Sequence, residues 1–362
     1  MKVLAFETSC DETGIALVYG EKIPGGFVFK TLKSALLSQA ALHAPYGGVY
    51  PNLAKREHEK NLPMLYKEFE SEPADAIAVT QGPGLEPALW QGIQFAKKIA
   101  REGTLPLLAI NHMEAHLVSS LAQPKIQHSN VLKNIRMFEL RDTQLPVLAL
   151  LISGGHTEFV LMREWFTYEV IGRTLDDAVG ECFDKVARML DLPYPGGPEI
   201  SRIALEARKK KLEAECRLPR PMIHSNNLNV SFSGLKTAAL YALRDKQLTE
   251  DERAAFAAEF EDAVADVFVS KTQKALKETG AKTFVIGGGV AANHYIRKRL
   301  ERLVLNDFPN IEFRLPDPSI TGDNAIMIAQ CALAHLTAGH WNLETESAGQ
   351  EIKAVGNLSI AG

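Results

Sequence analysis

The sequence predicts a layered α/β fold in which one domain pattern occurs twice. Three observations lead to this prediction: strand-like apolar runs alternate with helical periodicity, the order strand, turn, strand, strand occurs at the amino terminus and again near residue 147, and each copy contains a turn of small and polar residues. At 362 residues the chain is long enough for two domains, each with its own core.

The first half begins as an antiparallel meander and continues with alternating strands and helices. Pro24, Gly25 and Gly26 mark the turn after the second strand, and residues 81–84 break the chain after the fourth. In chain order we expect strands at 3–6, 15–19 and from 27, a helix at 53–69, a strand at 76–79, a helix ending at 99 and a strand at 107–110.

The second half restarts the same order. In chain order we expect strands at 147–152, 158–162 and 168–171, helices at 175–190 and 251–278, a strand at 283–286, a helix at 295–304 and a closing helix at 322–336. Two like halves, each opening with a hairpin whose turn can face a cleft, indicate duplicated ribonuclease-H-like domains of the actin, sugar-kinase and Hsp70 type. The nucleotide cleft would lie between them.

Domain boundaries follow from this repeat. The N-terminal actin-like subdomain spans 1–118 and is completed by the helix near 320–338, and the C-terminal subdomain spans 145–317. The polar stretch 119–144 has little periodicity, so we expect a loop insertion on the surface. The tail at 340–362 lacks an apolar face, and we expect it to be mobile or to bind a partner.

Composition narrows the class of protein. Hydrophobic residues make up 46% and charged residues 23%, as in a soluble globular protein, and no run approaches the roughly 20 apolar residues of a membrane span. The first apolar stretch is too short for a secretory signal, so we expect a cytoplasmic protein. The four cysteines lack CxxC spacing, which indicates neither a disulfide frame nor a thiolate metal site. A net charge of -4 argues against binding nucleic acid by bulk charge, so RNA contact requires local patches or a second protein.

His112 and His116 are the most informative pair in the chain. Residues four apart on a helix have Cβ atoms roughly 6 Å apart, so both imidazoles can converge on one metal ion. A third ligand is needed, and Asp323 offers a carboxylate at a loop-to-helix junction. Two imidazoles with one carboxylate leave positions open for water or substrate, as in a Lewis-acid or non-haem iron site. The alternatives are a pair of hydrogen-bonded histidines and an aspartate that only caps its helix.

The position of Glu114 argues against a metallopeptidase motif on the same helix. Zinc peptidases place the general base directly after the first histidine, as H-E-x-x-H. In this chain the glutamate is the second residue after His112, about 200° around the helix, and it should point away from the metal.

An acidic turn follows the first strand. Glu7, Asp11 and Glu12 lie close together there, and adjacent anions repel each other unless a cation or a substrate amine compensates them. A plain hairpin turn explains only Thr13 and Gly14. We therefore expect the acidic turn to have a function.

Further candidates for ligand binding lie in the second half. Small residues at 153–157 and 287–293 follow apolar strands, and their backbone N–H groups can approach an anion or a ribose closely. Asp184 could bind a ribose hydroxyl, and Gly197 in the turn at 194–198 would permit close backbone approach. The alternatives are ordinary turns and an acidic residue on a helix surface.

Together, these motifs closely resemble the universal tRNA threonylcarbamoyladenosine transferase family, formerly called the O-sialoglycoprotein endopeptidase family. The resemblance spans roughly residues 1–336. It implies transfer of a threonylcarbamoyl group from threonylcarbamoyl-AMP to N6 of adenosine 37 in tRNAs that read codons beginning with adenine. It also implies a small paralogous dimerisation partner and an ATPase partner, and no membrane.

The resemblance assigns roles by position. It implies that His112, His116 and Asp323 bind one divalent metal, Fe²⁺ first and Zn²⁺ second. It places the adenylate on eight residues, namely Leu151, Ile152, Ser153, Gly154, Gly155, Asp184, Gly197 and Asn293. At the matching acidic turn, Asp11 and Glu12 are candidates for taking the amine proton or binding the threonyl end.

Three departures from the family pattern limit these assignments. Ala115 replaces the common glycine, residues 87–91 are bulkier than usual, and 123–144 is longer than usual. The last two affect the partner surface and the tRNA path. Competing hypotheses are a metallopeptidase, which the position of Glu114 disfavours, and a scaffold or actin-like ATPase, which has no need for two histidines and an aspartate.

Overall fold

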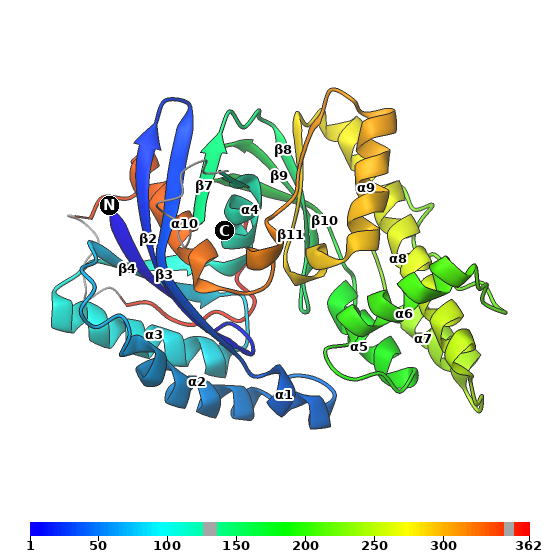
Figure 1. Cartoon of the computed structure of the whole chain (residues 1–362). Helices are drawn as coiled ribbons and strands as arrows, with labels where there is room; N and C mark the ends of the chain where they lie inside the picture. Colours follow the sequence, from blue (N-terminus) through cyan, green and yellow to red (C-terminus); the bar gives the residue numbers. More distant parts are fainter. Residues whose placement is uncertain (126–135, 344–350) are drawn as a thin grey trace. The chain divides into compact units, whose positions relative to one another are not determined.

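The computed structural model describes residues 1–125, 136–343 and 351–362 (Figure 1). It divides into two compact units. Unit 1 comprises Met1–Gln39, Val49–Thr143 and Leu315–Gly362, and unit 2 comprises Ala40–Gly48 and Gln144–Arg314. Within the described residues, no helix combines the length and apolar character that crossing a membrane requires.

A mixed sheet of seven described strands forms the centre of unit 1, in the order β5-β4-β1-β2-β3-β7-β6. Its strands are β1 (Lys2–Glu7), β2 (Glu12–Ile23), β3 (Gly26–Ser38), β4 (Ala76–Gly82), β5 (Leu107–Asn111), β6 (Gln123–Pro124) and β7 (Arg136–Arg141). The first three strands form the predicted antiparallel meander, and β4 and β5 continue the sheet in parallel with β1.

Helices cover both faces of this sheet (Figure 1). The helical elements of unit 1 are α2 (Pro51–Tyr66), α3 (Glu86–Gly103), α4 (His112–Leu121), η4 (Pro318–Ile320) and α10 (Ala325–Ala338). Alternate strand residues face opposite sides, so Phe6 joins a buried core with Leu62 of α2 and Ile93 of α3. On the other face Gly14 lies against α10, where a Cβ atom would come 3.0 Å from the backbone nitrogen of Ala325.

The sheet of unit 2 has five described strands in the order β10-β9-β8-β11-β12. They are β8 (Val147–Ile152), β9 (Thr157–Glu164), β10 (Thr167–Arg173), β11 (Thr283–Gly287) and β12 (Glu312–Arg314). An antiparallel meander again adjoins two parallel strands. This repeats the order β3-β2-β1-β4-β5 of unit 1, so the predicted duplication is confirmed.

Unit 2 contains more helix than the sequence analysis predicts. Its helical elements are α1 (Ala40–His43), η1 (Ala44–Tyr46), α5 (Val179–Met189), α6 (Gly196–Lys210), α7 (Ser233–Leu243), α8 (Glu250–Thr279), η3 (Gly289–Ala292) and α9 (His294–Asp307). The prediction overlooked α6 and α7. Helix α6 begins in a Gly-Gly-Pro sequence that is typical of a turn, and α7 buries only Leu235 and Ala239, too few for a clear apolar stripe.

The prediction of a loop over 119–144 is wrong for its described ends. Helix α4 continues to Leu121, and β7 pairs with β3 in a register that sets Phe138 opposite Phe29. Phe138 and Leu140 are buried, while the residues between and beside them are more exposed. The sequence gives little local indication of β7, because its pairing partner β3 lies about 100 residues earlier in the chain. Residues 126–135 lie outside the described residues.

The prediction that the tail is mobile is wrong for residues 351–362. The N–H of Val355 donates to the carbonyl of Gln81, and the N–H of Gly84 donates to the carbonyl of Gly356, both at 3.0 Å. Ile352 is only 2% exposed. Gly82 makes this approach possible, because a Cβ atom there would lie 2.0 Å from the carbonyl oxygen of Val355. Residues 344–350 of the predicted tail lie outside the described residues.

Candidate metal centre and nucleotide-binding residues

His112 and His116 lie one turn apart on α4, directly after β5. The side-chain oxygen of Asn111 starts this helix, because it accepts hydrogen bonds from the backbone N–H groups of Met113 (2.9 Å) and Glu114 (3.2 Å). The two imidazole rings lie edge to face with their centroids 4.7 Å apart. Local helix geometry therefore brings both rings to one side of α4.

Asp323 reaches both imidazoles. Its Oδ1 lies 3.3 Å from Nε2 of His112 and 3.0 Å from Nε2 of His116. The N-cap of α10 is Asn324, whose side chain accepts the backbone N–H of Met327. The capping alternative for Asp323 therefore does not hold, and its carboxylate faces the two histidines.

These three side chains fit a single cation. One donor atom from each of His112, His116 and Asp323 lies within 4.8 Å of the others. Two ligands that bind one ion at about 2.1 Å are at most about 4.2 Å apart, and the two imidazole-to-carboxylate distances are within this limit. Imidazole nitrogen with one carboxylate oxygen suits iron and zinc.

The charges of the cluster are strongly coupled. Burial by itself lowers the pKa of His112, but the negative charges of Asp323 and Glu7 outweigh it and raise that pKa to about 10. Burial opposes ionisation of Asp323, yet the charge of His112 and hydrogen bonds from both imidazoles hold the pKa of Asp323 well below its ordinary value. Burial lowers the pKa of His116. At neutral pH the imidazole of His112 is therefore protonated, and its positive charge lies where a bound divalent cation would place positive charge.

Glu7 contacts the far side of the His112 ring. It ends β1 and is fully buried, and its Oε2 lies 3.1 Å from Nδ1 of His112. The hydroxyl of Thr80 donates to the same oxygen at 2.6 Å, and the N–H of Ser9 donates to Oε1 at 2.5 Å. Sequence reasoning placed Glu7 in the acidic turn without a role. A carboxylate that directly continues an apolar strand was the signal that it is buried.

Asp11 lies in the turn that leads into β2, and Glu12 is the first residue of that strand. Burial, followed by the negative charges of Asp11 and Asp323, raises the pKa of Glu12 well above its ordinary value. The hydroxyl of Ser38 donates to Glu12 at 3.3 Å. Glu12 is therefore close enough to the metal-ligand cluster to be influenced by the charge of Asp323.

Glu114 belongs to a different cluster. Its Oε1 lies 2.8 Å from Nε2 of His335 on α10, and donor atoms of Glu114, Cys331 and His335 lie within 4.8 Å of one another. Burial and the charge of Glu114 raise the pKa of the Cys331 thiol. The carboxylate that a metallopeptidase would need as a base thus contacts α10 instead of the cluster of His112 and His116.

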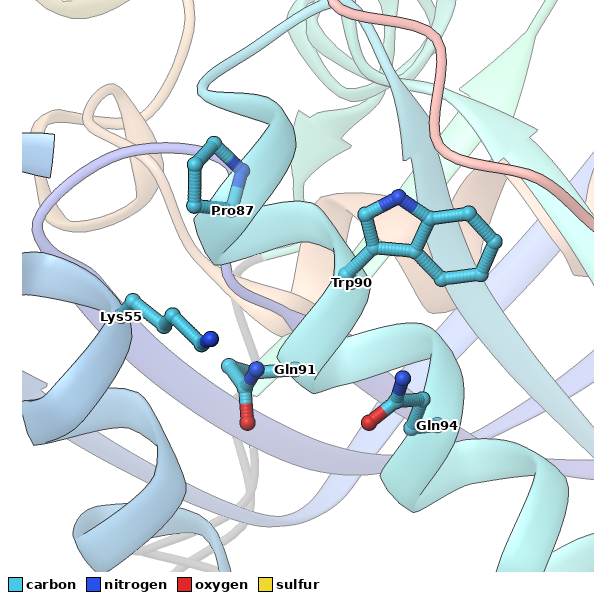
Figure 2. Close-up of a pocket in the computed structure, with 5 residues that line it drawn as sticks. All are labelled: Lys55, Pro87, Trp90, Gln91 and Gln94. Carbon is cyan, nitrogen blue, oxygen red and sulfur yellow. The ribbon is translucent and has the colours of Figure 1, made fainter. Parts of the chain in front are cut away.

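A pocket of about 350 Å³ lies on unit 1 beside α2 and α3 (Figure 2). It is lined by Lys55, Pro87, Trp90, Gln91 and Gln94. Three of these residues fall within the stretch 87–91 that departs from the family pattern. The bulkier residues of that stretch therefore shape a surface feature and do not contribute to the metal-ligand cluster.

In unit 2 the chain leaves β8 through an open turn. Leu151 and Ile152 are buried in the strand, whereas Gly154 and Gly155 are exposed, and a Cβ atom on either glycine would meet no atom within 4 Å. The hydroxyl of Ser153 accepts the backbone N–H of His156 at 3.0 Å. The turn is therefore anchored at Ser153 and open at its two glycines.

The second glycine turn packs against the end of β8. Gly288 has φ of 87°, and a Cβ atom there would lie 2.5 Å from the carbonyl oxygen of Ile152. Only glycine combines this backbone conformation with so close an approach. The segments 151–155 and 287–293, distant in sequence, are therefore neighbours.

Asp184 lies within α5, and Gly197 lies in the first turn of α6. Asp184 Oδ1 accepts the backbone N–H of Gly196 at 2.7 Å, which satisfies one of the unpaired donors at the start of α6. No atom lies within 4 Å of a Cβ built on Gly197. Asp184 therefore positions the start of α6, and Gly197 leaves it accessible.

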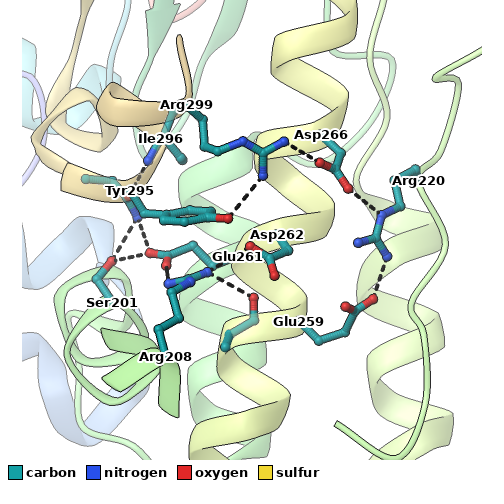
Figure 3. Close-up of polar contacts among 12 residues, drawn as sticks. Ser201, Arg208, Arg220, Glu259, Glu261, Asp262, Asp266, Tyr295, Ile296 and Arg299 are labelled. Carbon is teal, nitrogen blue, oxygen red and sulfur yellow. Dashed lines mark hydrogen bonds and ion pairs between the residues drawn. The ribbon is translucent and has the colours of Figure 1, made fainter. Parts of the chain in front are cut away.

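Asn293 is held by hydrogen bonds to residues of α6, α8 and α9, and Figure 3 shows the polar network around its partners Ser201 and Glu261. Its Nδ2 donates to Oγ of Ser201 (2.8 Å) and to Oε1 of Glu261 (2.7 Å), and its Oδ1 accepts the N–H of Ile296 (2.9 Å). The guanidinium of Arg208 binds Glu261 and lies 3.5 Å from the centroid of the Tyr295 ring.

Sequence reasoning missed Glu261, Ser201 and Arg208. Glu261 is fully buried and lies on α8 at helical spacing from Val264 and Phe268, which are buried as well. A carboxylate within an apolar stripe was therefore the available signal. Ser201 and Arg208 gave none, because α6 itself was not predicted.

Comparison with protein families identifies relatives along most of the chain. The model of the family TsaD, tRNA N6-adenosine threonylcarbamoyltransferase, matches residues 30–330. A protein of that name from Thermosipho africanus (strain TCF52B) is 37% identical over 367 residues, covering 99% of this chain and 100% of the relative. Another of that name, from Buchnera aphidicola subsp. Schizaphis graminum (strain Sg), is 42% identical over 334 residues and covers 91% of each chain.

Solved structures agree on the fold. HypF from T. kodakarensis matches with a TM-score of 0.54 at 15% identity, covering 95% of this chain and 49% of HypF. A full-length HypF in the phosphate- and nucleotide-bound form has the same TM-score at 14% identity, covering 94% of this chain and 47% of that one. The chain thus spans about half the length of either HypF chain, and the likeness concerns the fold alone.

Proposed function

The chain belongs to the TsaD family of tRNA N6-adenosine threonylcarbamoyltransferases, and on this premise we propose which residues carry out its reaction. It is an acyltransferase that moves the threonylcarbamoyl group of threonylcarbamoyl-AMP to N6 of adenosine 37 in tRNAs reading codons that begin with adenine. The observation that supports a catalytic centre in unit 1 is the convergence of two imidazole nitrogens on one oxygen of Asp323.

His112, His116 and Asp323 hold one divalent cation, Fe²⁺ in the first place and Zn²⁺ in the second. The ligand set supports this choice, because two imidazoles and one carboxylate leave positions open on either metal. A metal bound there would stabilise negative charge that develops on the phosphate or carbonyl oxygen of the donor.

Unit 2 binds the adenylate. The exposed backbone of Gly154 and Gly155, after Leu151, Ile152 and Ser153, offers N–H groups that can approach a phosphate. Asp184 and Gly197 contribute at the start of α6. Gly197, which is open at the N-terminus of that helix, supports an anion contact, and the carboxylate of Asp184 accepts a hydrogen bond from a ribose hydroxyl.

Asn293 has a narrower role in this scheme. Both of its amide protons are used by Ser201 and Glu261, and its oxygen accepts one hydrogen bond from Ile296. The second lone pair of that oxygen can accept a hydrogen bond from a ribose hydroxyl. Asn293 therefore acts as an acceptor that the surrounding network holds rigid.

Glu12 and Asp11 handle the proton. The N6 amine of adenosine attacks the carbonyl carbon of the donor, the bond from that carbon to the phosphate oxygen breaks, AMP leaves, and a carboxylate takes the amine proton. The raised pKa of Glu12 supports its role as general base, because a base works best with a pKa near the working pH. Asp11 beside it favours the protonated product of that step.

The partners are tRNA, a small paralogous dimerisation partner and an ATPase partner, and the chain works in the cytoplasm. Family membership supports these assignments. The net charge of -4 adds that tRNA must meet a local basic patch or a surface completed by a partner.

Nucleoside analysis of tRNA from cells depleted of this protein tests the proposed function. Threonylcarbamoyladenosine should disappear and return with the wild-type gene, but not with a His116→Ala variant. Unchanged modification in depleted cells without a second copy of the enzyme would contradict the proposal. A metallopeptidase activity is not favoured, because Glu114 contacts His335.

A further inference from the structure

Glu7, His112 and Asp323 lie in a row within unit 1, with the imidazole between the two carboxylates. Glu7 Oε2 faces Nδ1 of His112 at 3.1 Å, and Nε2 on the other side of the same ring faces Oδ1 of Asp323 at 3.3 Å. Glu7 and His112 are 105 residues apart in the chain and meet because β1 and β5 both flank β4. The imidazole thus lies between a buried carboxylate and the proposed metal site.

Metal binding depends on which nitrogen of the His112 ring carries the proton. A neutral imidazole carries its proton on one nitrogen and has a lone pair on the other, and only the lone pair can bind a metal. An ionised carboxylate can only accept hydrogen bonds. Glu7 therefore requires the proton on Nδ1, which leaves the lone pair of Nε2 directed towards Asp323 and His116.

We infer that Glu7 is a positioning residue that selects the metal-binding tautomer of His112. The inference rests on the proposed metal site and adds a residue outside its ligand set. Carboxylates that hydrogen-bond to the far nitrogen of a metal-bound histidine fix the ring and its tautomer, and their loss typically costs about 10- to 100-fold in metal affinity.

The substitution Glu7→Gln replaces one carboxylate oxygen by an amide nitrogen, and the neighbours of Glu7 determine which one. In Glu7→Gln the N–H of Ser9 still needs an acceptor, so the amide oxygen must take the place of Oε1. The amide nitrogen then replaces Oε2, beside the hydroxyl of Thr80 and Nδ1 of His112. An amide nitrogen only donates, so Nδ1 must accept and the proton must move to Nε2, where it blocks metal binding.

The experiment titrates the full-length, metal-free protein with Zn²⁺ by calorimetry and with Co²⁺ by visible absorbance. Glu7→Gln should weaken binding about 10- to 100-fold, while Thr80→Val should bind within about threefold of wild type. The threonine variant is the matched control, because it removes a hydrogen bond to the same oxygen of Glu7 and keeps the carboxylate. Thermal unfolding of both variants checks that the fold is retained.

Weaker metal binding by Glu7→Gln could result from the wrong tautomer of His112 or from the loss of a negative charge near the metal. Nitrogen-detected NMR of the imidazole rings distinguishes these two causes, because it reports which nitrogen carries the proton. In the zinc-loaded wild type, His112 should carry its proton on Nδ1 and bind zinc through Nε2. Zinc bound through Nδ1, or a Glu7→Gln affinity equal to that of wild type, would overturn the inference. If the wild type bound no metal through His112 and Asp323, the proposed function itself would fail. The wild-type spectrum decides the matter even if Glu7→Gln does not fold.

Discussion

Glu114 Oε1 lies 2.8 Å from Nε2 of His335, which joins α4 to α10 through a buried pair. The same short helix directs His112 and His116 towards Asp323, which directly precedes the N-cap of α10. One helix thus presents metal-binding groups on one side and a structural carboxylate on another. The residues that resemble a peptidase motif, His112, Glu114 and His116, therefore belong to two separate clusters.

Glu114→Gln should destabilise the protein and leave its metal affinity unchanged. Loss of a buried charged hydrogen bond should lower the free energy of unfolding by about 1–3 kcal/mol, measured by urea denaturation. The control is Glu102→Gln, because Glu102 pairs with Lys98 on the exposed side of α3 and should cost at most about 0.5 kcal/mol. Clean cleavage of a glycoprotein that requires Glu114 would contradict this assignment.

Asp323→Asn should remove the metal. An amide is a weaker ligand and lacks the charge that holds both imidazoles, so bound metal should fall from one per chain to well below one, and transfer to tRNA should fall by about 10²-fold or more. Elemental analysis and a transfer assay measure both effects. Asp317→Asn is the control, since Asp317 caps the neighbouring η4 by accepting the N–H of Ser319. Full metal content in Asp323→Asn would show that other side chains bind the ion.

Glu261→Gln should weaken binding of the adenylate more than it slows the reaction. The change removes the charge that pairs with Arg208 and loosens Asn293, so we expect about tenfold weaker binding of AMP, equivalent to about 1.4 kcal/mol. Calorimetry with AMP measures it. Asp262→Asn is the matched control, because Asp262 also binds Arg208 at 2.9 Å, and the structure shows no bond from it to Asn293. Equal effects of the two variants would argue against a special role of Glu261.

Ile352→Ala should show that the carboxyl-terminal segment is part of the core. Ile352 is 2% exposed and belongs to the cluster that contains Phe6 and Ile93. Truncation of a buried isoleucine to alanine costs about 2–5 kcal/mol, which urea denaturation will detect. Lys353→Ala, at the exposed neighbouring position, should change stability by less than about 0.5 kcal/mol. A mobile segment would give the same small effect in both variants.

The metal-free protein should lose stability in alkaline solution. The pKa of His112 is raised in the folded state to about 10 from an ordinary 6.5, so its contribution is complete below pH 6.5 and is lost as the pH rises through about 10. Each unit of pKa difference corresponds to about 1.4 kcal/mol. The measurement compares unfolding of wild type and His112→Asn from pH 6 to about pH 10 with a chelator present. A difference between the two that does not change with pH would contradict the predicted charge of His112.

Local patterns in the sequence determined much of the fold and brought together two of the three ligands of the proposed metal centre. Alternation with period two places the meanders, and a spacing of four on a helix brings His112 and His116 together, because both depend only on backbone geometry within a few residues. Repetition of this local order also indicated the duplicated architecture. Asp323 and the turns of the second half were candidates from their residue types, and the family resemblance implied their roles.

Only the tertiary structure decided which distant groups meet. Glu7 reaches His112 across 105 residues, Glu261 reaches Asn293 from another helix, and residues 351–362 add to a core formed by the first strand and α3. Helix α6 and strand β7 likewise depend on partners that are remote in the chain. These contacts arise from burial of apolar surface and from the need of buried carboxylates for hydrogen-bond donors, and neither leaves a periodic pattern in the sequence.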